Sequence, residues 1–74
     1  AAMALTYTLL VDNAEKYSDT FPDADALAAD ASHRAAAFGS TVGANQLATD
    51  IKNGFTSIDL RLSQPAVTVQ VRAA

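Results

Sequence analysis

A helical period over residues 22–38, PDADALAADASHRAAAF, constrains the fold of this chain more than any other feature. Apolar residues recur there at the three- and four-residue spacing that places side chains on one face of a helix. These residues are Ala24, Leu27, Ala28, Ala31, Ala35 and Phe38. The pattern predicts a long amphipathic helix that separates an N-terminal strand from a C-terminal hairpin.

Residues at both ends of this segment favour the same helix. Thr20 followed by Asp23 resembles a capping box with aspartate in place of glutamate. Gly39 suits a stop in the left-handed conformation. Asp30 and Arg34 stand four residues apart, and we expect them to pair on the exposed side of the helix.

A second face of the predicted helix is almost entirely alanine. It consists of Ala26, Ala29, Ala36 and Ala37. Alanine has the best helix propensity but buries little apolar area, so such a face allows the backbone of another chain to approach closely. We therefore predict a contact with a partner chain here; a solvated face that reflects alanine-rich composition is the competing explanation.

The length of the chain favours association. A single domain over 1–74 is small, and a domain of this size buries only about 60% of the surface of its unfolded chain. Small domains usually add disulfides, a metal or oligomerisation. The chain has no cysteine and one histidine, which excludes a disulfide and a thiolate metal site. We expect a protein partner, either a homo-oligomer or a larger assembly.

The charge argues against nucleic acid as a partner. The net charge is −3, and the five lysines and arginines are scattered along the chain, whereas nucleic-acid binders usually present a basic face. No apolar run has membrane-spanning length. No basic region of a secretory signal precedes the first apolar residues, so the cytoplasm is the default expectation for localisation.

Strict alternation predicts a strand over 3–11. Met3, Leu5, Tyr7, Leu9 and Val11 share one face of this strand, and their period of two is typical of a half-buried strand. The large apolar residue on the other face is Leu10, which we include among the predicted interaction residues. Residues 14–19 are expected to form a connection to the helix.

A short second helix and a hairpin are predicted for the C-terminal half. Asn45 is a plausible N-cap for a helix over 46–53, whose apolar side contains Leu47, Ala48 and Ile51. Two alternating runs, 55–62 and 67–72, flank a turn at 63–66. The predicted register places Leu62 opposite Val67, Leu60 opposite Val69 and Ile58 opposite Val71.

These elements predict an α+β fold with the order β-α-α-β-β. The economical arrangement is a three-stranded antiparallel sheet with one long and one short helix packed on one face. Its two edges would be open to pairing with other chains, and Arg72, Pro65 and Asp59 are candidates for blunting them.

No residue set predicts catalysis, a metal site or a cofactor. His33 falls off the apolar stripe, and its neighbour Ser32 faces elsewhere on a helix, so the two do not form a catalytic dyad. The acidic residues at 19–30 lack the glycine and the terminal glutamate of a calcium loop. We therefore expect a protein that is not an enzyme; an enzyme would need a site shared between subunits.

The sequence favours a small structural or interaction protein that self-associates or docks as a subunit of a larger assembly. Ala26, Ala29, Ala36, Ala37 and Leu10 are the candidate contact residues. The alternative is a DNA-binding regulator or accessory factor that uses the helix pair at 23–53. Its second helix has one lysine and no arginine, which is little for contacts with phosphates and base edges.

Overall fold

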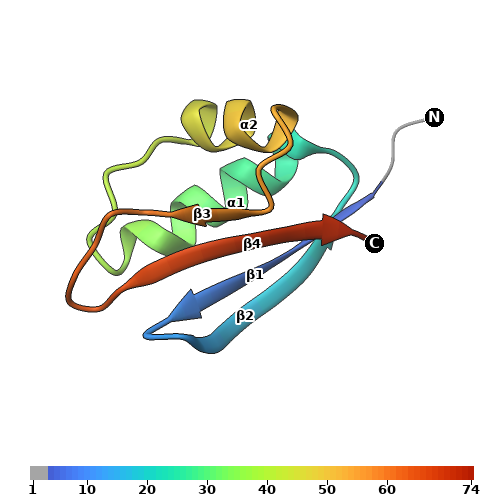
Figure 1. The fold of residues 1–74 in the computed structure, drawn as a ribbon. Helices are drawn as coiled ribbons and strands as arrows, with labels where there is room; N and C mark the ends of the chain where they lie inside the picture. Colours follow the sequence, from blue (N-terminus) through green and yellow to red (C-terminus); the bar gives the residue numbers. More distant parts are fainter. Residues whose placement is uncertain (1–3) are drawn as a thin grey trace.

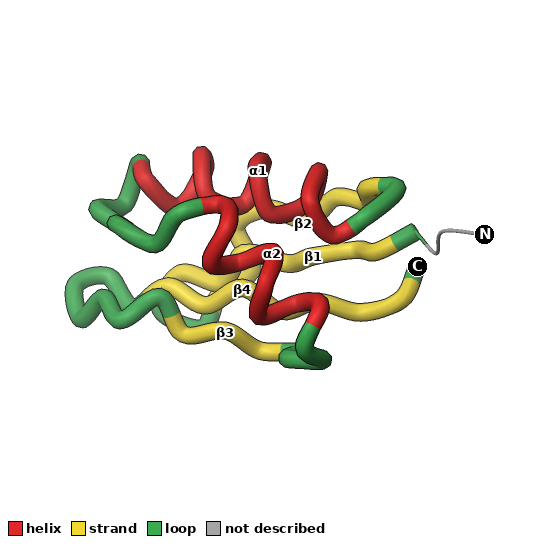
Figure 2. The backbone as a smooth tube through the Cα atoms, turned by 90° about the horizontal axis from the view of Figure 1, so that it is seen from above, coloured by secondary structure: helices red, strands yellow, loops and turns green. Residues whose placement is uncertain are grey.

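The computed structural model describes residues 4–74 as a two-layer α+β domain (Figure 1). The elements are β1 (Leu5–Val11), β2 (Ala14–Phe21), α1 (Ala24–Ala36), α2 (Ala44–Lys52), β3 (Ser57–Asp59) and β4 (Val67–Ala73). The strands form one antiparallel sheet in the order β2-β1-β4-β3. Both helices cover the same face of this sheet (Figure 2). The α+β class is confirmed, but the sheet has four strands where we predicted three.

The additional strand is β2, which occupies the segment we expected to be a connection. Asp12 and Asn13 have positive φ values of 52° and 66°, and two such residues form the tight turn that matches the twist of a β-hairpin. The chain therefore folds back on β1, with Tyr17 opposite Leu9. The residues of β2 are mostly polar and small, which concealed the strand.

The turn gives a stability prediction. Asn13→Ala should lower the free energy of unfolding by about 1 kcal/mol, because alanine lacks the short polar side chain through which asparagine tolerates a left-handed backbone. Asn13→Gly should retain the natural stability, since glycine adopts this conformation freely. Urea unfolding followed by circular dichroism measures both. An equal loss in the two variants would show that the asparagine side chain, and not the backbone conformation, stabilises the turn.

The two helices form where predicted, with different N-caps. Asp23 caps α1, because its Oδ1 accepts a hydrogen bond of 2.8 Å from the Ala26 N–H. Thr20, the predicted cap, lies in β2. Gly43, two residues before Asn45, caps α2 without a side-chain bond. The predicted stop at Gly39 is confirmed by its φ of 99°.

The C-terminal hairpin is confirmed, but its register is wrong by two residues. Ile58 lies opposite Val69 and not Val71, and the Leu60 N–H donates to the Val67 carbonyl at 3.1 Å. The Asp59 Oδ1 accepts the backbone N–H of Arg61 at 2.9 Å, and Arg61 has a φ of 62°. This local turn ends β3 after three residues, so the loop is longer than the predicted turn. An even shift keeps the apolar side chains on the core face.

The core lies between the helices and the sheet. Leu27 and Leu47 are the large helix residues that are fully buried, and Tyr7, Leu9, Val67 and Val69 are their counterparts from the sheet. No helix within residues 4–74 has the length and apolar character needed to cross a membrane. Met3, the first residue of the predicted N-terminal strand, lies outside the described residues.

Candidate functional site

The predicted interaction residues do not form one continuous surface. Ala29 and Ala36 are exposed on α1, Ala37 is exposed directly after it, and Ala26 is half-buried. Leu10 is half-buried on β1 and alternates with the core residues of that strand, so it lies on the sheet face that the helices leave uncovered. The sheet therefore separates Leu10 from the alanine face of α1.

The structure shows a different apolar surface around Phe55. This residue is the one exposed large hydrophobic side chain among residues 4–74, with 56% of its surface accessible. It borders a groove of about 340 Å³ that is lined mainly by apolar side chains. These include Leu5, Ala24, Ile51, Val71 and Ala73. The groove therefore brings together the start of α1, the end of α2 and the ends of β1 and β4.

The backbone holds Phe55 in place. The Phe55 N–H donates to the Asp50 carbonyl at 3.1 Å, and the Gly54 N–H donates to the Ile51 carbonyl at 3.0 Å. Gly54 has a φ of 94°. This pair of bonds, with glycine in the left-handed conformation, is the Schellman motif that ends many helices. The motif usually directs the residue after the glycine toward the helix, so Phe55 remains beside Ile51 even though half of it is in solvent.

Charges flank the groove on two sides. At the start of α1, Asp25 forms an exposed salt bridge with Lys52, with 2.9 Å between the Asp25 Oδ1 and the Lys52 Nζ. Asp23 lies two residues before Asp25. On β4, Arg72 lines the groove and has no salt bridge to a described residue. The groove is therefore lined by two basic residues, Lys52 and Arg72, and the acidic start of α1 adjoins it through Ala24.

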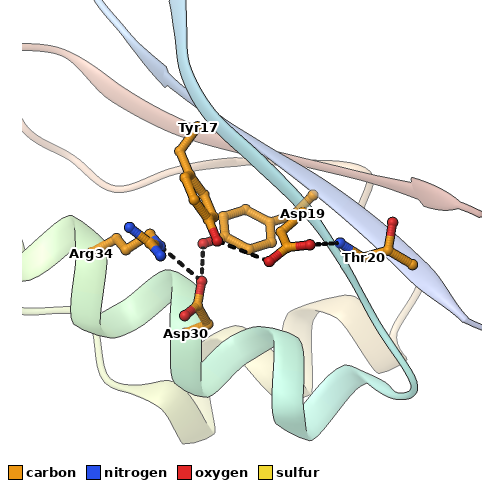
Figure 3. Close-up of polar contacts among 6 residues, drawn as sticks. Tyr17, Asp19, Thr20, Asp30 and Arg34 are labelled. Carbon is orange, nitrogen blue, oxygen red and sulfur yellow. Dashed lines mark hydrogen bonds and ion pairs between the residues drawn. The ribbon is translucent and has the colours of Figure 1, made fainter.

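A second cluster ties α1 to the hairpin of β1 and β2 through polar contacts (Figure 3). The Tyr7 hydroxyl, in a fully buried side chain, donates to Oδ2 of Asp30. The same oxygen accepts the Arg34 Nε–H at 3.0 Å. The guanidinium carbon of Arg34 lies 3.4 Å from the centre of the Tyr17 ring, a cation–π contact.

The edge strand completes this cluster. The Tyr17 hydroxyl donates to Asp19 at 2.9 Å, and the Thr20 N–H donates to the other oxygen of that carboxylate at 2.8 Å. The Thr20 N–H, followed by the Tyr17 hydroxyl, lowers the pKa of Asp19. The bond to Asp19 raises the pKa of Tyr17. Burial, followed by the bond to Asp30, raises the pKa of Tyr7 far above 10.0.

The arrangement suits positioning and not chemistry. Each tyrosine hydroxyl is held as a neutral donor to a carboxylate, whereas a nucleophile or general base needs a free lone pair directed at a substrate. Within residues 4–74 no three histidine, aspartate or glutamate side chains gather to hold a metal ion. The predicted pair of Asp30 and Arg34 is present, but it packs on the hairpin and not on the exposed side.

Sequence reasoning placed Tyr7 on the buried face of its strand, but it missed the polar contacts of both tyrosines and the exposure of Phe55. The pair of tyrosines depends on β2, which we did not predict. The position of Phe55 beside the end of α2 carried a usable signal, because an aromatic residue directly after an Asn-Gly helix stop is placed to pack back on the helix, but nothing in the sequence indicated that the ring is exposed.

Comparisons with protein-family models, with curated proteins and with solved structures gave no match. We therefore infer function from the chain's own residues and their geometry.

Proposed function

We propose that this chain is a small interaction protein, without catalytic activity, that pairs with a second copy of itself through the groove around Phe55. The observation that carries the proposal is the exposed aromatic ring beside an apolar groove. Aromatic side chains that fill a partner's pocket contribute much of the binding energy of interfaces.

Two features support a second copy as the occupant. Phe55 is part of the groove, so a two-fold axis through it would place each ring in the groove of the other chain, as isologous dimers do. The charges also fit, because acidic Asp23 and Asp25 on one side of an apolar centre would face Arg72 of the other copy. With one aromatic anchor per chain, the dimer should dissociate on dilution.

Light scattering across a dilution series tests the proposal. The natural chain should change from dimer to monomer as it is diluted. Phe55→Glu should be monomeric at every concentration and remain folded, because the side chain is half in solvent. A natural chain that is monomeric throughout would overturn self-association.

Ala36→Glu is the matched variant for the alanine face of α1. It places the same charge on an exposed position of the chain, at the other end of α1 from the groove. If the groove is the contact, Ala36→Glu should dimerise like the natural chain. Loss of the dimer in Ala36→Glu, with retention in Phe55→Glu, would assign the contact to the alanine face.

The DNA-binding alternative has less support from the helix pair. Lys52, the one basic residue of α2, is engaged by Asp25, and Gln46 donates to Asp50 at 3.1 Å. The exposed side of α2 therefore offers few free donors for phosphates. A duplex titration without salt-dependent affinity would remove this alternative.

A further inference from the structure

A basic pocket lies between β2 and the C-terminal end of α1. It has a volume of about 340 Å³ and is lined by Lys16, His33 and Arg34 together with the apolar groups of Leu9, Tyr17 and Phe38. The chain has a net charge of −3 and only five lysines and arginines in addition to this histidine. Three of its six basic side chains therefore meet at one pocket, and no carboxylate is among the lining residues in the described part of the chain.

A β-bulge brings Lys16 to this pocket. The register between β1 and β2 shifts after the pair of Leu9 and Tyr17, and the next pair joins Leu10 to Glu15. Lys16 is the extra residue of the bulge. Neighbours in a regular strand point to opposite faces of the sheet, yet Lys16 and Tyr17 both line the pocket. Bulges often redirect a side chain near a functional site.

Arg34 is positioned before any ligand arrives. Its Nε is bound to Asp30, its guanidinium lies over the Tyr17 ring, and Asp30 is itself held by the buried Tyr7. The terminal nitrogens of Arg34 make no hydrogen bond to another residue within 4–74, and 40% of the side chain is accessible. A guanidinium fixed in this way presents donors that fit a carboxylate or a phosphate.

From this geometry we propose that the pocket binds a small aromatic anion, either an aryl phosphate or an aryl carboxylate. Lys16 and Arg34 would hold the anionic group, and Phe38 with Leu9 would contact the ring. The volume is at the small end of the range for ligand pockets. The acidic remainder of the chain opposes a long polyanion such as RNA. The pocket and the Phe55 groove lie at opposite ends of α1, so ligand binding does not depend on self-association.

Amide chemical-shift titration of the full, isotopically labelled chain tests this proposal, with phenyl phosphate as the probe. We expect saturable shifts confined to residues 15–18 and 33–38. Inorganic phosphate and phenol should each bind more weakly than phenyl phosphate. Lys16→Gln should weaken binding by about tenfold, because it removes one charged contact from an exposed site. Arg34→Gln should have at least the same effect if the variant folds.

Lys52→Gln is the control, since it removes another exposed lysine near the other end of α1, where it pairs with Asp25, and should leave the affinity unchanged. Shifts that do not saturate would overturn the proposal. An equal affinity in Lys16→Gln and Lys52→Gln would do the same, because the attraction would then be a general charge effect. Inorganic phosphate that binds as tightly as phenyl phosphate would overturn the aromatic part of the ligand assignment.

Discussion

Truncation of Leu27 to alanine should lower the free energy of unfolding by about 2–5 kcal/mol. Leu27 is the one large side chain of α1 that is completely buried; the other buried residues of this helix are Ala28, Ala31 and Ala35. A domain of this length has a total stability of roughly 4–11 kcal/mol. The loss of a single leucine therefore removes a large fraction of the total.

Leu10→Ala is the matched control for this experiment. It removes the same atoms from a leucine on the uncovered face of the sheet that is less completely buried than Leu27. We expect a smaller loss of stability than in Leu27→Ala, since the transfer term scales with buried apolar area. Chemical unfolding of both variants measures the difference. Similar losses at the two positions would mean that the alanines, and not Leu27, anchor α1.

The alanine stripe is the part of the fold that sequence described best. The spacing of the apolar residues from Ala24 to Phe38 predicted both α1 and its buried face. A helix whose apolar residues share one face packs on a sheet with that face toward the sheet. Close packing of alanines is present within the chain on this stripe, whereas the partner contact predicted for the second alanine face stays a prediction. Ala28, Ala31 and Ala35 are fully buried against the rest of the domain, so small residues bring α1 close to its own neighbours.

The edge strand could not be predicted from hydrophobic period, because an edge strand has little to bury. β2 exposes most of its side chains, and only Tyr17 and Phe21 pack against the core. The usable signal was the turn: Asp12 and Asn13 belong to the residue types that tolerate positive φ. The register of β3 was predicted wrongly because β3 ends in a turn at Asp59. This turn includes a side-chain hydrogen bond that hydrophobic period does not reveal.

The buried polar contact was beyond sequence reasoning altogether. Tyr7 and Asp30 are 23 residues apart, and nothing in their local patterns links a strand residue to a helix carboxylate. Alternation placed Tyr7 on the core face, where a phenol needs a partner for its hydroxyl group. Only the path of the chain supplies Asp30 as that partner. Tertiary structure therefore determines this hydrogen bond, and the bond should affect how the stability of the domain depends on pH.

Replacement of Tyr7 by phenylalanine should lower the free energy of unfolding by about 1–3 kcal/mol at neutral pH, because Asp30 loses a buried donor. It should also change the alkaline limb of the stability profile. Burial and the bond to Asp30 raise the pKa of Tyr7 in the folded state above its ordinary value of 10.0. Above about pH 10 the unfolded chain therefore releases a proton from this residue that the folded chain retains.

The raised pKa of Tyr7 determines the direction in which stability changes with pH. Where the folded state binds more protons, stability falls as pH rises, by up to about 1.4 kcal/mol per pH unit for one group. The contribution of Tyr7 is thus complete below pH 10 and is lost at higher pH. In Tyr7→Phe the free energy of unfolding should fall less steeply with pH, by the slope that corresponds to one proton. The stabilities of the natural chain and of Tyr7→Phe should therefore converge as the pH rises.

Tyr17→Phe separates this effect from the other groups that titrate at high pH. Tyr17 is more exposed and bonds an exposed carboxylate, so we expect it to have a smaller effect on stability at high pH than Tyr7. Urea unfolding at a series of pH values should therefore show a steep alkaline decline in the natural chain and in Tyr17→Phe, and a shallow one in Tyr7→Phe alone. Parallel curves for the natural chain and Tyr7→Phe above pH 10 would mean that the phenol ionises without unfolding, and that its bond to Asp30 does not hold α1 on the hairpin.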